Sequence, residues 1–273
     1  MQALPSAAYF LFAEAAAGGI IALFWIHLRD TVPRGFTVFT GACLLTCGLL
    51  AVWLRLAFAP VVVADINPAA AYAFALDRTL GLACCALLAL YLVSLRIPAW
   101  AGLVRLLSPV VPLLALLWLW SAALVDANAQ LGGLGVPLAV LAGGMALGTA
   151  VVALSLGHWY LVSPTLSVRP LVRLTFLCLG AVLAQVVLLP LLIALPGPRP
   201  ERVQALFGEY LVFFGVRVVF GLLVPLGVLV MTWRTARIRS LDSATGLLYI
   251  AVALILAGEI AARTLLYLSG LTT

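Results

Sequence analysis

Four ionisable residues lie inside long apolar stretches of this sequence, namely Glu14, Arg217, Glu259 and Arg263. Glu259 and Arg263 are four residues apart, so on a helix they share one face and can form an ion pair. A carboxylate beside guanidinium donors can hold a polar head group and carry a proton. A quinone needs this chemistry, because its ring carbonyls accept hydrogen bonds and its redox reaction exchanges protons. The alternative is a structural ion-pair cluster that holds helices together.

Three further polar residues lie near the ends of apolar stretches. Arg55 comes close to the end of the second stretch, and Glu209 and Tyr210 lie at the beginning of the seventh. If the stretches are antiparallel helices, all three residues belong to the same half of the molecule as the four buried ones. They are therefore possible additional members of the same site.

The two histidines, His27 and His158, each lie at the end of an odd-numbered apolar stretch, beside aromatic residues. This is the setting of residues at a membrane–water interface, so we expect no haem, although two histidines could in principle ligate one.

The five cysteines form no CxxC pair and fall in apolar segments, which favours a packing role over a metal or redox site. No P-loop, HExxH or GxSxG motif is present, so we expect no catalytic residue in the chain itself.

These residues must be positioned by helices in a lipid bilayer. Of the 273 residues, 66% are apolar and 9% are charged, whereas soluble domains carry about 25% charged residues. Apolar runs of about 20 residues predict membrane-spanning helices. The sequence therefore predicts an all-α, polytopic helical bundle with eight spans in one membrane domain, divided into halves at 1–128 and 129–273. The spans are expected near 7–28, 36–58, 78–95, 103–125, 134–157, 170–195, 207–232 and 243–268.

The arginines predict how the bundle is oriented. Loops after the first, third, fifth and seventh spans carry most of them, including Arg34, Arg96, Arg169 and Arg237. The opposite loops hold fewer arginines, and the acidic residues Asp65, Asp77, Asp126, Glu201 and Glu209 are assigned to that side. Cytoplasmic loops of membrane proteins are enriched in basic residues, so both termini are expected outside the cytoplasm. The net charge of +6 thus reflects topology and not nucleic-acid binding, since no basic patch with interleaved aromatics is present.

Two segments resemble a known family. FAEAAAGGIIAL at 12–23 is similar to the first helix of the membrane anchor subunit of bacterial dimethyl sulfoxide reductases, and LILAGEIAARTLLY at 254–267 is similar to its last helix. Anchors of the polysulfide-reductase and nitrite-reductase type play a similar role. Two features depart from the family: LAFAPVV after Arg55 lacks a histidine, and GHWYLVSPTL at 157–166 has no counterpart.

The resemblance implies a quinone-interacting anchor in the inner membrane of a bacterium, with menaquinone or ubiquinone as bound substrate and no haem. The implied partners are an iron–sulfur subunit and a molybdenum catalytic subunit outside the membrane. The matching motifs contain Glu14, Glu259 and Arg263, which would then belong to the quinol site. Two alternatives stay open: a transporter or channel that uses the same buried charges, and a haem-bearing anchor like cytochrome b.

The predicted topology can be tested with reporter fusions. A reporter that is active only in the cytoplasm should work when fused after Arg34, Arg96, Arg169 or Arg237, because these residues lie in the basic loops. It should fail after Asp65, Asp126 or Arg202. Two or more reversals among these fusions would exclude the arrangement of eight spans with external termini.

Overall fold

The structure, a computed structural model, describes residues 3–30, 32–58, 68–127, 133–163, 165–194 and 200–273, and these residues contain helices and no strands. The helices of the first half are α1 (Ala3–Arg29), α2 (Arg34–Ala57), α3 (Pro68–Ser94), the short 3₁₀ helix η1 (Pro98–Trp100) and α4 (Ala101–Asp126). Those of the second half are α5 (Gly135–Val162), α6 (Arg169–Ala194), α7 (Pro200–Phe207), α8 (Leu211–Gly215), the π-helix η2 (Val216–Leu223), α9 (Val224–Arg237) and α10 (Leu241–Ser269). The helices α8, η2 and α9 run on as one span.

Eight helices are long and apolar enough to cross a membrane, as the sequence predicts. Four of the predicted spans have a boundary that is wrong by four residues or more. The third span begins at Ala71 and not near 78, and the fourth begins at Pro98 and not near 103. The fifth continues to Val162 and not 157, and the seventh runs from Leu211 to Arg237 and not from 207 to 232. The error in the third span arose because Asp77 and Arg78 suggested a loop, whereas Asp77 is buried inside α3.

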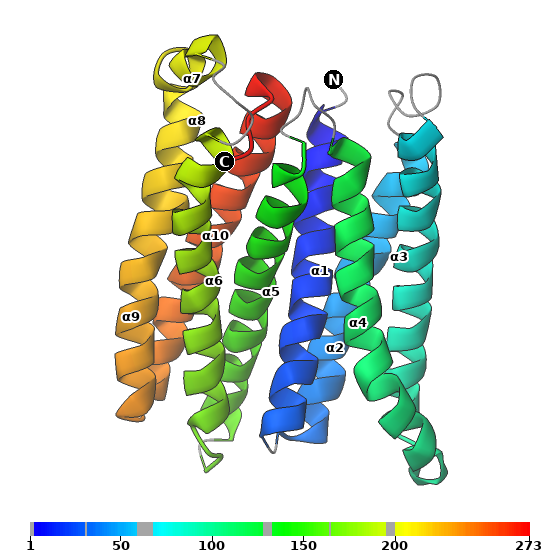
Figure 1. The fold of residues 1–273 in the computed structure, drawn as a ribbon. Helices are drawn as coiled ribbons and strands as arrows, with labels where there is room; N and C mark the ends of the chain where they lie inside the picture. The colour runs from blue at the N-terminus through cyan, green and yellow to red at the C-terminus, as the bar shows by residue number, and fades with distance from the viewer. Residues whose placement is uncertain (1–2, 31, 59–67, 128–132, 164, 195–199) are drawn as a thin grey trace.

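The helices stand side by side, and both termini lie at the same end of the bundle (Figure 1). We call this the terminal end, and we call the half of the bundle next to it the terminal half. The arginines of the connections after α1, α3, α5 and α9 lie at the opposite end, which we call the arginine-rich end. The structure contains no membrane, so the assignment of the terminal end to the outside stays a prediction.

The helices α1 and α5 form the centre of the bundle (Figure 1). In their apolar stretches 72% and 67% of the residues are buried, against 22% in α6, which faces outward. Around them, α2, α3 and α4 pack on one side and α6, α9 and α10 on the other. Because α1 and α5 pack directly against each other, the two halves share one core, and the division at 128 and 129 stays a prediction.

Glycines let the α1 and α5 backbones touch. A Cβ added at Gly18 would collide with the backbone carbonyl of Gly144, and one added at Gly148 would collide with the backbone of Gly18 and Gly19. Small residues at such positions are the usual means by which membrane helices approach closely. Gly144 and Gly148 lie four residues apart on α5, and together they form the surface that α1 packs against.

All buried charged side chains in the described part of the chain lie in the terminal half. They are Glu14, Arg55, Asp77, Arg217, Glu259 and Arg263. Buried polar residues toward the arginine-rich end are uncharged, for example Thr40, whose hydroxyl is 2.6 Å from that of Ser155. Since a charge inside a bilayer costs about 2.5–3.5 kcal/mol even on insertion scales, this one-sided placement needs an explanation.

The contact between α1 and α5 yields a prediction about stability. Gly148→Leu should destabilise the protein by about 3 kcal/mol or more, the upper end of the cost of overpacking, because it meets backbone that cannot move aside. The matched control is Gly180→Leu in α6, where no atom lies within 4 Å of an added Cβ. Thermal unfolding of the purified protein should separate the two variants. Equal unfolding midpoints would show that α1 and α5 do not touch as described.

Candidate functional site

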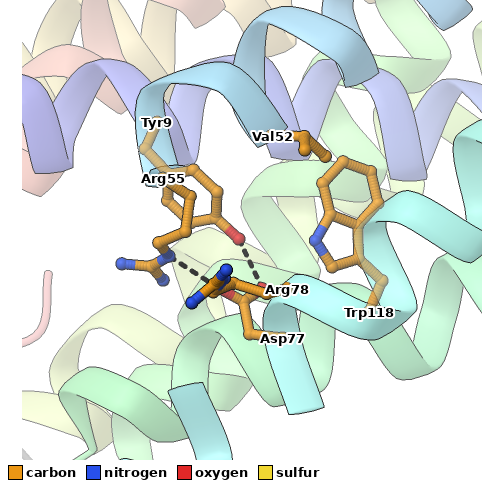
Figure 2. A pocket seen from close by; sticks show the side chains of 6 residues that line it. All are labelled: Tyr9, Val52, Arg55, Asp77, Arg78 and Trp118. Carbon is orange, nitrogen blue, oxygen red and sulfur yellow. Dashed lines mark hydrogen bonds and ion pairs between the residues drawn. The ribbon is translucent and has the colours of Figure 1, made fainter. Parts of the chain in front are cut away.

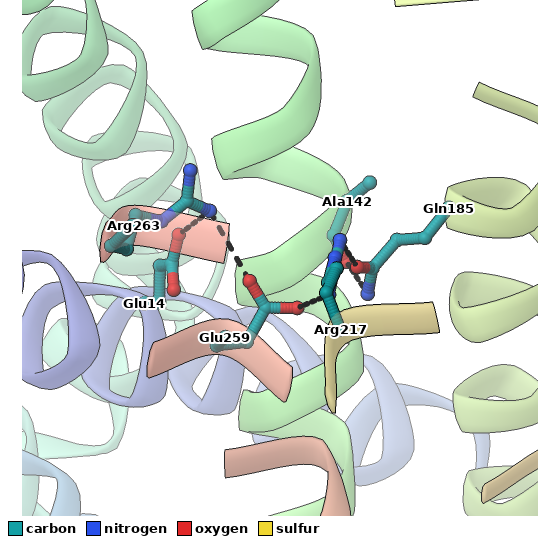
Figure 3. A network of polar contacts seen from close by, with 6 residues as sticks. All are labelled: Glu14, Ala142, Gln185, Arg217, Glu259 and Arg263. Carbon is teal, nitrogen blue, oxygen red and sulfur yellow. Dashed lines mark hydrogen bonds and ion pairs between the residues drawn. The ribbon is translucent and has the colours of Figure 1, made fainter. Parts of the chain in front are cut away.

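A chain of polar contacts crosses the terminal half of the bundle, and we call it the buried network (Figure 3). Arg263 on α10 donates to Glu14 on α1 and, over 3.3 Å, to Glu259 one turn earlier on its own helix. Arg217 donates to the other oxygen of Glu259 over 3.1 Å and to Oε1 of Gln185 on α6 over 2.5 Å. All five residues are at most 4% exposed, so the network is shielded from solvent and lipid.

Local backbone features make room for the network. A Cβ at Gly143 of α5 would lie 2.6 Å from Oε2 of Glu259 and 3.0 Å from Nη2 of Arg263, so only glycine leaves space for this ion pair. A Cβ at Gly221 would lie 2.5 Å from Cα of Gly258, which brings η2 against α10. Arg217 lies in the π-helical segment η2. Such segments are rare and often occur at functional sites.

The buried network has balanced charges. It contains two carboxylates and two guanidinium groups, and each carboxylate is within hydrogen-bonding distance of at least one guanidinium. Pairing of this kind is what makes buried charges tolerable in a medium of low dielectric constant. Some polar atoms still have no hydrogen-bond partner among the residues that the structure describes, namely Oε2 of Glu14 and the Nε atoms of Arg217 and Arg263. The network can therefore accept and donate further hydrogen bonds.

A second polar cluster lies between α1, α2 and α3 (Figure 2). Tyr9 donates to Oδ1 of Asp77 and Arg55 donates to Oδ2, each over 2.6 Å. The Arg55 guanidinium also lies 3.8 Å from the centre of the Tyr9 ring, a cation–π distance. All three side chains are at most 3% exposed. Nη2 of Arg55 has no hydrogen-bond partner within the described part of the chain, so this cluster also keeps a donor that those residues do not use.

A small cavity adjoins the second cluster. Tyr9, Arg55 and Asp77 line it together with Val52, Arg78 and Trp118 (Figure 2). Its volume of about 10 Å³ gives room for about one water molecule. Arg78 is exposed, whereas Trp118 is buried. The cavity thus brings a free guanidinium donor, a carboxylate, a phenol and an indole together within the terminal half.

Aromatic residues connect the buried network with the second cluster. The Phe10 ring centre lies 6.0 Å from the guanidinium of Arg55 and 5.6 Å from that of Arg263. At the end of α4, Asp126 accepts a hydrogen bond of 3.1 Å from Tyr267, one turn beyond Arg263 on α10. Asp126 also interacts electrostatically with both Arg55 and Arg263. The two groups of charges are therefore neighbours and not independent sites.

The structure brings together the four residues singled out first, Glu14, Arg217, Glu259 and Arg263, in the buried network. Arg55 belongs to the second cluster instead. Glu209 and Tyr210 lie in the turn between α7 and α8, where Glu209 is exposed. The backbone of Tyr210 donates to the carbonyl of Ala205 and accepts from the amide of Phe214. Within the described part of the chain, neither side chain contacts the network.

Sequence reasoning missed five members of this region: Tyr9, Asp77, Asp126, Gln185 and Tyr267. Gln185 was detectable, because it is a polar residue in the middle of an apolar span. Asp77 was noticed but assigned to a loop on the outer face, and the correction is that it lies in α3, 1% exposed and paired with Arg55. Its neighbours Ala73, Phe74 and Leu80 to Ala83 are compatible with a helix that continues through it.

The histidines and the GHWYLVSPTL segment lie at the arginine-rich end, away from both clusters. His158 is exposed, and no group of three His, Cys, Asp or Glu residues able to hold a metal is found among the described residues. Trp159 packs edge-on against Phe36, with ring centres 6.2 Å apart, and the Tyr160 hydroxyl donates to the carbonyl of Ser167. This segment therefore ties α5 to α2 and to the connection that follows it.

Comparison with known proteins does not assign the chain to a family. No family model matches it, and no curated protein matches it. The resemblance to dimethyl sulfoxide reductase anchors thus stands on the two short segments alone.

The ion pairs of the buried network can be tested by removing one charged partner and measuring the stability of the protein. Arg263→Gln should destabilise the protein by about 3–5 kcal/mol, because it leaves Glu14 buried without its cation. The double variant Glu14→Gln/Arg263→Gln should recover part of this loss, since both charges are then gone. Unfolding midpoints and membrane levels are the measurements.

The control is Arg173→Gln. Arg173 pairs with Asp30 over 2.8 Å, but its side chain is 45% exposed, so its loss should cost about 1 kcal/mol or less. A double variant that is less stable than Arg263→Gln alone would contradict the ion-pair description.

Proposed function

We propose that this chain is the quinone-interacting membrane anchor of a multi-subunit bacterial oxidoreductase. The observation that carries the proposal is the concentration of all buried charged residues of the described chain in one half of the bundle, next to one membrane surface. A quinol that enters from the bilayer needs protonatable groups near the surface where its protons leave. It does not need a polar path across the whole membrane.

The second cluster is the place where the quinone ring would bind. Arg55 has a free Nη2 that can donate to a ring carbonyl, and Asp77 and Tyr9 can exchange a proton with the quinol hydroxyl. The cavity holds about one water molecule, so the side chains that line it would have to move apart to admit the ring. The buried network, with Glu14 and Glu259, lies behind this site and would buffer the charge changes of the reaction.

Oxidation of a quinol to a quinone releases two electrons and two protons. In the proposal the protons leave through carboxylates of the terminal half, and the electrons pass to an iron–sulfur subunit bound at the terminal end. A molybdenum catalytic subunit would consume the electrons there. The chain alone would then have no turnover, which agrees with the absence of catalytic motifs in its sequence.

A transporter or channel is the competing proposal, and the charge distribution counts against it. A transport path for a polar solute or proton should continue to the arginine-rich end. Among the described residues of that half, the buried polar side chains are hydroxyl groups such as Thr40, Thr175 and Thr245. Thr175 and Thr245 each donate to a carbonyl four residues earlier in their own helix, so neither hydroxyl hydrogen is directed at a solute.

Binding of a quinone can be tested on the purified chain by fluorescence. Trp118 lines the cavity, so a water-soluble quinone analogue should quench its emission on binding. Trp118→Phe should remove most of the saturable quenching, although six other tryptophans remain. Asp77→Asn should weaken the analogue's affinity by about tenfold, because it removes the charge that orients Arg55.

Turnover in the assembled complex completes this test. Asp77→Asn should lower quinol oxidation per assembled complex by about 100-fold or more, as expected for loss of a general base. Asp30→Asn, at the arginine-rich end, is the matched control and should leave turnover unchanged. Saturable quenching that survives in Trp118→Phe, together with normal turnover in Asp77→Asn, would refute the proposed quinone site.

A further inference from the structure

A groove at the arginine-rich end, between the start of α2 and the end of α3, takes no part in either polar cluster. We call it the α2–α3 groove. Its volume is about 530 Å³, within the range of about 300–1,000 Å³ that is usual for ligand sites. Arg34 and Arg96 stand at its entrance, and its wall is formed by Gly35, Val38, Phe39 and Ala42.

The groove results from the pattern of residues on α2. Positions 35, 38, 39 and 42 recur at helical spacing and so lie on one face of the helix. Ala42 has a small side chain, which leaves the wall low at that end. A Cβ added at Gly35 would lie 3.0 Å from the Trp159 ring, so Gly35 lets α2 pack against α5 beside the groove. Phe39 is 57% exposed, so the wall presents apolar surface that the described chain does not cover.

The charges at the groove are all positive. Arg34 and Arg96 are exposed, and neither side chain forms a hydrogen bond or an ion pair with another residue that the structure describes. The helix α2 begins at Arg34, and no side chain caps it. Its first amide groups and its helix dipole therefore also favour an anion at this end.

We propose that the α2–α3 groove binds an anionic phospholipid. The phosphate would lie between the guanidinium groups of Arg34 and Arg96, which suit phosphate oxygens well. One acyl chain would lie along Val38, Phe39 and Ala42. From Arg34 to Ala42 the helix rises about 12 Å, which is a length of apolar wall that a soluble anion would not use. Both arginines lie at ends of spans, at the level of lipid head groups.

The test uses the full-length chain in detergent, with phosphatidylglycerol as the probe and phosphatidylcholine as the neutral comparison. Native mass spectrometry should show tighter binding of phosphatidylglycerol. Arg34→Gln/Arg96→Gln should weaken it by about 30-fold, the effect expected for two surface arginines near a membrane. Arg105→Gln/Arg234→Gln, which alters two other exposed arginines of the same end, should change it little.

A third variant separates the lipid from a free phosphate. Ala42→Trp fills the groove without altering a charge, so it should weaken phosphatidylglycerol binding, and soluble glycerol phosphate should not compete with the lipid. Three outcomes would overturn the proposal: equal binding of both lipids, equal losses in the Arg34/Arg96 and Arg105/Arg234 variants, or full competition by glycerol phosphate. Dimers that Ala42→Trp disrupts, with no preference for phosphatidylglycerol, would assign the groove to a second copy of the chain instead.

Discussion

The rest of the structure depends on the contact between the backbones of α1 and α5. Gly18 meets Gly144, and Gly148 meets Gly18 and Gly19, so the two central helices lie closer than side chains would permit. Glu14 is one turn from Gly18, and its backbone lies 3.6 Å from the Cβ position of Gly144. The same contact therefore sets how far the Glu14 carboxylate reaches across α5 toward Arg263 on α10. The packing of the glycines therefore also determines where the buried charges lie.

Burial in a bilayer explains why the polar groups are organised in chains and not as isolated pairs. Each guanidinium of the buried network has several donors, and one carboxylate cannot satisfy them all. Arg217 is shared between Glu259 and Gln185, and Arg263 between Glu14 and Glu259. A change in protonation at one carboxylate would therefore alter the hydrogen bonds and electrostatic interactions of every residue in the network. This shared response supports our proposal that the network belongs to a protonatable site and does not serve helix packing alone.

The sequence predicts much of the fold because lipid imposes a strong and simple rule. A run of about 20 apolar residues must be a helix, and eight such runs are visible by composition alone. The largest error in a span boundary occurs where a charged residue, Asp77, is buried. Asp77 was read as the end of a span, because pairing with Arg55 across two helices cannot be seen from either helix alone. Glu209 shows the opposite case: its charge near a span end suggested a site, but α7 ends before it and leaves it exposed. Glu14, Arg217, Glu259 and Arg263 could be proposed from depth and spacing. Tyr9 could not, because its contact with Asp77 joins two helices and its type is common near the end of a span.

The π-helical segment η2 has a consequence for how the seventh span should be compared with other chains. A π-helix contains about one residue more than the regular α-helix that occupies the same length, and each added residue turns what precedes it by about 100°. The inward position of Arg217 thus depends on a count of residues and not only on residue type. A related chain could lose one residue between 218 and 223 and stay as apolar overall, yet direct this guanidinium away from Glu259. An alignment that places no gap there would describe the two spans as equivalent, although one would lack the central cation of the network.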